Sequence, residues 1–183
     1  MHYKFLQFVC FVDCFDYKLL NNLPKNTWII YRNYSNIIDI KSIIKLKNFC
    51  RIYKKKFFLS NNIKLSLKLG LDGVYIPAFN NSLNIRFYKT KKQFIYLGSA
   101  HNISEIKIKE RQNINHIFLS PFFEKKNKLK PLGIYRFNIL KKNTSAKLVC
   151  LGGINRKNLK IMNMIKPFGI AAISLFKDKF LYT

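Results

Sequence analysis

The sequence predicts one α/β domain over residues 1–183, closed as a single (β/α)8 TIM barrel. Short apolar runs alternate with amphipathic stretches from one end of the chain to the other, and there are eight such runs. This alternation is typical of repeated β-α units that build a parallel sheet. An open, doubly wound sheet needs a glycine-rich turn after its first strand, whereas residues 13–16 read DCFD. The closed barrel is therefore favoured.

The eight apolar runs are expected to form the strands of the barrel. With only a short segment after the last run, the barrel is short and its C-terminal helix should be reduced or missing. That would leave an apolar flank that a partner chain could cover, so a homodimer is possible. The runs are Phe8–Asp13, Trp28–Tyr31, Phe57–Ser60, Gly73–Ile76, Phe94–Ser99, His116–Phe123, Leu148–Gly152 and Ile170–Leu175.

Three helices carry signals of their own. Between the second and third runs, apolar residues recur near helical spacing among basic ones, which predicts an amphipathic outer helix over residues 37–53. Asn102 followed by Glu105 predicts a capped helix start. After a glycine pair, Asn155 precedes apolar residues at helical spacing, which predicts a helix that begins near Asn155.

The chain is strongly basic, with 34 Lys+Arg against 8 Asp+Glu and a formal net charge of +26. Such a charge suits nucleic acid, an anionic membrane or a phosphorylated substrate. The lysines are spread along the chain, however, and Lys, Asn, Ile, Phe and Tyr are over-used together, as an AT-rich genome would cause. We therefore expect small phosphorylated substrates as partners and no specific nucleic acid.

The cysteines and the apolar runs indicate the cellular compartment. The four cysteines form neither a CxxC pair nor a disulfide framework, which is typical of a reducing environment. The apolar run over residues 5–12 is too short to span a membrane, and the stretch behind it does not resemble a signal-peptide cleavage region. We expect a cytoplasmic protein with no membrane partner.

The ends of the last two strands predict a phosphate site. Barrel enzymes build their sites at the carboxyl ends of the strands, and the loops after strands seven and eight often bind phosphate. Gly152 and Gly153 follow the seventh strand, and their lack of Cβ lets backbone N–H groups approach an anion. The helix expected near Asn155 would add its positive end. The eighth strand ends in small residues up to Ile173 and Ser174, which again expose amides.

Other strand ends supply polar and basic side chains. This rim suits a pyrophosphate, although for any single lysine a solvated surface role is the ordinary expectation. His101 and His116 have no partner at recognised metal spacing, so structural or solvent-facing roles are expected for both. The candidates on the rim are Arg32, Asn61, Asn80, Ser99, Lys125 and Lys128.

Five segments, from about the third predicted strand to the eighth, carry a family resemblance. They are LGLDGVY at 69–75, LGSAHN at 97–102, LSPFF at 119–123 with PLG at 131–133, CLGGI at 150–154 and FGIAAIS at 168–174. In the same order they resemble the motifs lGaDGvH, GvSaHn, lGPvFpTxTK…plG, aLGGI and aGvAvIS of the thiamine-phosphate synthase and thiazole tautomerase family. The tautomerase branch has a His where this chain has Pro121, so the synthase branch is favoured.

The resemblance implies an enzyme of thiamine biosynthesis that joins an aminopyrimidine pyrophosphate to a thiazole phosphate and releases pyrophosphate. Catalysis in that family is mostly stabilisation of charge on the leaving pyrophosphate. Carried over by position, Arg32, Ser99 and Lys128 would be catalytic. Residues that would bind substrate or phosphate are Gly152, Gly153, Ile173, Ser174, Asn61 and Lys125.

The resemblance also implies Mg²⁺ as cofactor, and here the chain departs from the family. Both positions that carry metal-binding Asp in the family are amides in this sequence, Asn61 and Asn80. Mg²⁺ favours anionic carboxylates, so we expect its affinity to fall. Lys125 could supply part of the missing positive charge.

Three hypotheses follow from the sequence. The first is a divergent thiamine-phosphate synthase. The second is a catalytically impaired relative that binds a thiamine precursor or thiamine phosphate, because the phosphate-binding residues are retained while the metal ligands are not. The third, which rests on the net charge alone, is a basic protein that binds nucleic acid.

Overall fold

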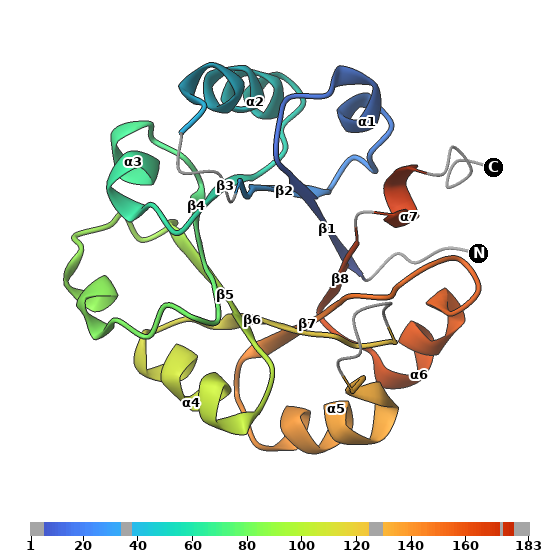
Figure 1. The fold of residues 1–183 in the computed structure, drawn as a ribbon. Coiled ribbons are helices and arrows are strands. Elements are labelled where there is room, and N and C mark those ends of the chain that lie inside the picture. The colour runs from blue at the N-terminus through green and yellow to red at the C-terminus, as the bar shows by residue number, and fades with distance from the viewer. Residues whose placement is uncertain (1–5, 34–37, 125–129, 173, 178–183) are drawn as a thin grey trace.

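The structure, a computed structural model, is a closed barrel of eight parallel strands, each paired to the next in sequence and β8 to β1. It describes residues 6–33, 38–124, 130–172 and 174–177. Figure 1 shows the helices arranged around the outside of the strands. The predicted (β/α)8 fold is confirmed. The strands are β1 (Gln7–Val12), β2 (Trp28–Tyr31), β3 (Phe57–Ser60), β4 (Gly73–Ile76), β5 (Ile95–Ala100), β6 (His116–Leu119), β7 (Lys147–Leu151) and β8 (Gly169–Ala171).

The helices between the strands are mostly short. The longest, α2, is the amphipathic helix that the sequence predicts, and α7, after β8, spans four described residues. The α-helices are α1 (Tyr17–Asn21), α2 (Ile40–Ile52), α3 (Ile63–Lys68), α4 (Ile103–Arg111), α5 (Gly133–Lys142), α6 (Met162–Ile165) and α7 (Ser174–Lys177), with 3-10 helices η1 (Leu83–Phe87) and η2 (Leu159–Ile161).

Two strands are shorter than the sequence predicts. β6 ends at Leu119 because Pro121 has no backbone N–H to continue the ladder. β8 ends at Ala171, and α7 begins at Ser174, so the apolar residues 172–175 belong partly to a turn and a helix. An apolar run cannot by itself separate a buried strand from the buried helix that follows it.

The start of α4 is built as the sequence predicts. The Asn102 side chain accepts a hydrogen bond from the Glu105 amide at 2.9 Å. The Glu105 carboxylate accepts in return from the Asn102 amide group and from the His101 backbone N–H. His101 therefore lies in a helix cap, where its ring also contacts Glu105 at 2.8 Å.

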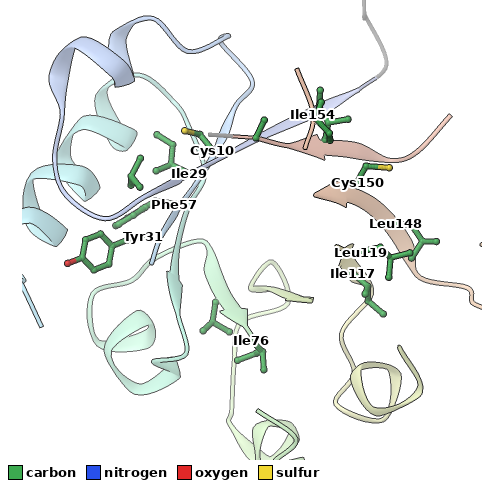
Figure 2. Close-up of a cluster of buried hydrophobic side chains, with 14 of the residues drawn as sticks. Cys10, Ile29, Tyr31, Phe57, Ile76, Ile117, Leu119, Leu148, Cys150 and Ile154 are labelled. Carbon is green, nitrogen blue, oxygen red and sulfur yellow. The ribbon is translucent and has the colours of Figure 1, made fainter. Parts of the chain in front are cut away.

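The core has two layers, because side chains on a strand alternate between the two faces of the sheet. The outer layer fills the space between strands and helices, and Figure 2 shows part of it around Cys10, Ile29 and Cys150. The inner layer fills the barrel itself. Its buried members are Val9, Phe11, Trp28, Ile30, Phe58, Tyr75, Leu97, Phe118, Val149 and Ala171.

His116 helps to close the end of the barrel at which the strands begin. It is buried, and its ring packs against Trp28 and Phe168 with ring centroids 5.5 and 4.9 Å apart. Burial, together with the nearby charges of Lys147 and Lys56, lowers the pKa of His116 to about 4. The ring is therefore neutral in the folded protein at pH 7.

We expect the free energy of unfolding to fall as the pH drops from 6.5 to 4. In this window the unfolded chain binds a proton at His116 that the folded chain refuses, and after allowance for solvent screening the loss is roughly 1–2 kcal/mol. Urea unfolding at pH 7.5 and 5.0 measures it. His116→Gln should remove this contribution to the pH dependence, and an unchanged dependence in the variant would refute the assignment.

Candidate active site

The candidate residues gather where the strands end. All eight strands run in parallel, so their carboxyl ends form one rim of the barrel. Arg32 follows β2, and its backbone N–H donates to the Val12 carbonyl at the end of β1. Ser99 lies in β5 next to Phe118 of β6 in the strand register. The rim that the sequence predicts therefore brings Arg32 and Ser99 to the same end of the barrel.

Arg32 lies over an aromatic floor inside this rim. Its guanidinium carbon is 4.4 Å from the ring centroid of Phe11. Phe11 packs edge-to-face against Tyr75 and Phe118, with centroids 5.3 and 5.9 Å apart, and all three rings are buried in the inner core layer. The guanidinium of half-buried Arg32 thus rests on packed aromatic rings, and a guanidinium is a group that binds anions through its N–H donors.

The position of Ser99 follows from strand alternation. Leu97 belongs to the inner core layer and Ala100 to the outer one. Ser99 therefore faces the interior of the barrel, two residues along the strand from Leu97. It is 6% exposed, which limits it to contact with a ligand that enters the mouth of the barrel.

The ends of β7 and β8 lie side by side, with Leu151 paired to Ala171. Gly152 and Gly153 follow directly and have φ angles of 96° and 72°, which favour glycine. No described group accepts a hydrogen bond from either of their amides. Their carbonyls, in contrast, are hydrogen-bonded. The Gly152 carbonyl accepts a hydrogen bond from the Phe123 amide, and the Gly153 carbonyl accepts one from the Asn158 side chain.

The helix predicted near Asn155 does not begin there. The Asn155 side chain instead accepts hydrogen bonds from the amides of Lys157 and Asn158 in a turn, and the 3-10 helix η2 starts only at Leu159. Asn competes for backbone donors in this way and so favours turns over helix interiors. The prediction that a helix dipole at Asn155 supports the phosphate site is wrong. Any support comes from the backbone amides themselves.

The two candidate metal ligands contact each other. The Asn80 amide group donates to Asn61 Oδ1 at 2.6 Å, and Asn80 Oδ1 accepts from the Ser82 amide at 3.0 Å. Both side-chain oxygens thus already accept hydrogen bonds, and neither carries a charge. In the part of the chain that the structure describes, no three His, Cys, Asp or Glu side chains form a group that could hold a metal. These residues do not fit Mg²⁺, which binds through carboxylates.

The sequence analysis missed a buried lysine behind this asparagine pair. Lys109 of α4 is 0% exposed, and its Nζ donates to the Pro77 and Asn80 carbonyls at 2.8 and 2.7 Å. Burial lowers the pKa of Lys109 to about 8. A signal existed in the sequence, because Lys109 shares the inward face of its helix with Ile106, three residues earlier.

Several candidates lie outside the described residues. These are Lys125, Lys128 and Ile173, and the side chain of Ser174 is likewise not described. Their assignments stay predictions. Among the described residues, no helix is both long enough and apolar enough to cross a membrane.

Fold and rim together define a class, a (β/α)8 barrel with polar groups placed where barrel enzymes build their sites. The family model for thiamine monophosphate synthase matches residues 22–176. The chain therefore belongs to the thiamine monophosphate synthase family, as the sequence motifs indicate.

Individual relatives agree with this family. The chain is 25% identical over 128 residues to a putative thiamine-phosphate synthase 2 of Aquifex aeolicus, a match that covers 69% of this chain and 68% of the relative. It is 29% identical over 146 residues to a thiamine-phosphate synthase of Prochlorococcus marinus, covering 76% of this chain but only 39% of that longer protein.

A solved structure supports the fold. The thiamine phosphate pyrophosphorylase of Pyrococcus furiosus superimposes with a TM-score of 0.72 at 15% identity, covering 96% of this chain and 92% of the other. At this identity the likeness establishes the barrel fold and not the chemistry.

Proposed function

We propose that the protein is a thiamine-phosphate synthase that joins an aminopyrimidine pyrophosphate to a thiazole phosphate and releases pyrophosphate. One observation carries the proposal. The paired ends of β7 and β8 hold Gly152 and Gly153, whose amides have no acceptor among the described residues, on the same rim as Arg32. We infer the two substrates from membership of the family, and both carry the phosphate groups that such a rim would bind.

The chemistry asks the protein mainly to stabilise charge. The carbinyl carbon–oxygen bond of the pyrimidine substrate breaks, the electron pair leaves with pyrophosphate, and the thiazole nitrogen then attacks the carbinyl carbon. Arg32 would bind the departing pyrophosphate, with Lys128 as a second proposed cation. Ser99 would donate a hydrogen bond to the leaving group or the pyrimidine. The amides of Gly152 and Gly153 would bind the thiazole phosphate, together with residues 173 and 174.

A coupled-substrate assay tests the proposal. Purified protein is incubated with both substrates, once with Mg²⁺ and once with a chelator, and thiamine phosphate and pyrophosphate are measured. We expect equal amounts of the two products. Absence of both products at high enzyme concentration under either condition would remove the synthase assignment.

A second candidate is a relative that binds a thiamine precursor or thiamine phosphate without turnover. The hydrogen-bonded Asn61–Asn80 pair favours it, because that pair stands where the family's metal ligands are expected. Calorimetry with each substrate and with thiamine phosphate separates the two candidates. Binding without product formation supports the second. A cytoplasmic location, a homodimer and the lack of a specific nucleic-acid partner stay predictions.

A further inference from the structure

Lys109 is enclosed by oxygen atoms in the way that a bound cation would be. Its Nζ lies 2.8 Å from the Pro77 carbonyl, 2.7 Å from the Asn80 carbonyl and 3.1 Å from Gln112 Oε1. An ammonium has three N–H donors, and three acceptors surround this one. The charge is therefore fully paired with oxygen dipoles although the residue is 0% exposed.

The same network fixes the loop between β4 and β5. The Gln112 amide group donates to the carbonyls of Asn80 and Ser82, each at 2.9 Å. The Asn80 carbonyl thus receives hydrogen bonds from two buried side chains of one neighbouring segment. A loop anchored at three carbonyls, those of Pro77, Asn80 and Ser82, has little freedom to move relative to α4.

The anchored loop sets the direction of the Asn80 side chain. Its Oδ1 is turned toward the Ser82 amide, which leaves its amide group to donate to Asn61 at the end of β3. Asn61 and Asn80 line a cavity of ≈ 460 Å³ between these two strand ends. The orientation of Asn80, which lines this cavity, therefore depends on the hydrogen bond that Lys109 donates to its backbone carbonyl.

The network also opposes a metal ion at this edge. An ammonium held 2.7 Å from the Asn80 backbone carbonyl places a positive charge next to one residue of the pair, and like charges in a buried setting repel. The nearby side chains that accept hydrogen bonds are neutral amides. The cluster thus gathers loop oxygens around an ammonium.

We propose that Lys109 is a positioning residue for the candidate active site, in which its buried ammonium orders the β4–β5 loop and the Asn61–Asn80 pair in place of a divalent cation. The proposal deepens the proposed function, since it concerns the same rim of the barrel. Its tests use no thiamine substrate. Failure of the synthase assay therefore leaves them unaffected.

The first test compares wild type with Lys109→Met and with Lys45→Met, which removes the same charge from an exposed position on α2. Hydrogen exchange and side-chain amide resonances are followed by NMR. In Lys109→Met we expect amides of residues 77–88 to exchange at least about 10-fold faster, and the Asn61 and Asn80 side-chain resonances to shift. Lys45→Met should match wild type. Unchanged exchange and resonances in Lys109→Met would overturn the proposal.

A second variant guards against global unfolding of Lys109→Met. Gln112→Met removes the other donor to the Asn80 carbonyl and keeps the lysine. It should accelerate exchange in the same residues by a smaller factor, with strands on the opposite side of the barrel unaffected. If Gln112→Met leaves residues 77–88 as protected as in wild type, the network does not position the loop.

The second test uses Mn²⁺ alone, titrated and followed by electron paramagnetic resonance. Wild type should show no saturable site at this edge up to about 1 mM, whereas Asn61→Asp combined with Asn80→Asp restores two carboxylates and should gain one. Saturable binding by wild type that Asn61→Ala abolishes would show that a cation does occupy the edge, and the proposal would fall.

Discussion

Replacement of Gly153 by Ala is expected to lower the free energy of unfolding by about 2–4 kcal/mol and to abolish binding of thiazole phosphate. The φ angle of Gly153 is 72°, which an L side chain rarely adopts. A Cβ there would also lie 2.7 Å from Phe123 Cβ and 2.9 Å from its carbonyl oxygen. The turn would have to shift, and its amides would move with it. Chemical unfolding and calorimetry measure the two effects.

Gly70 provides a matched control for this variant. Its φ angle is 61°, but a Cβ added there meets nothing within 4 Å. Gly70→Ala should therefore cost only the backbone term, about 1 kcal/mol, and should leave phosphate binding unchanged. If the two substitutions had equal effects on the free energy of unfolding and on phosphate binding, the close contact with Phe123 would contribute to neither, and the prediction would be wrong.

Replacement of Arg32 by Met is expected to reduce kcat/KM for thiamine phosphate formation by about 10²–10³-fold while the protein stays folded. Met retains an apolar contact with the Phe11 ring, so the aromatic floor persists, but the charge and the N–H donors are lost. Because charge on pyrophosphate develops during bond breaking, the loss should fall mainly on kcat. Steady-state kinetics with both substrates varied measures it.

Arg86 offers the comparison, since it too lies over a phenylalanine ring, at 5.8 Å from the Phe87 centroid, but is exposed on η1. Arg86→Met removes the same charge and the same kind of ring contact, but from a ring, Phe87, that is exposed and does not belong to the inner core layer. It should retain activity within about twofold. If both variants lose activity equally, net charge and not the position of Arg32 governs catalysis.

The barrel was predictable from the sequence because parallel strands buried on both faces are continuous apolar runs. Trp28–Tyr31, Phe57–Ser60 and Gly73–Ile76 form strands with the predicted bounds. Two predicted strands, which ended at Phe123 and Leu175, were too long. Buried side chains such as Phe122 and Leu175 continue the apolar run beyond the end of each strand. Hydrophobicity reports burial, and it does not report which backbone geometry achieves the burial.

The site was predictable only where it depends on strand ends. Arg32, Ser99 and the glycine pair lie on the predicted rim because chain order alone places them there. The contact between Asn61 and Asn80 joins residues 19 apart and depends on side-chain directions in two loops. Such directions follow from tertiary packing, which sequence periodicity does not contain.

The burial of Lys109 was also not predictable, in this case because of the composition of the chain. In a chain with 34 basic residues, each lysine is expected on the surface. Several instead bind backbone carbonyls, as Lys109 and Lys55 both do. Part of the large positive charge therefore serves to hold loops in place, a use that a count of charges does not reveal.

Titration of ¹⁵N-labelled protein with the thiazole phosphate tests most directly whether the ends of β7 and β8 bind an anion through exposed amides. The account predicts that the Gly152 and Gly153 resonances shift downfield and saturate together, with Gly153→Ala abolishing the effect. Shifts confined to lysine-rich helices on the outside of the barrel, with both glycine resonances unmoved, would contradict it.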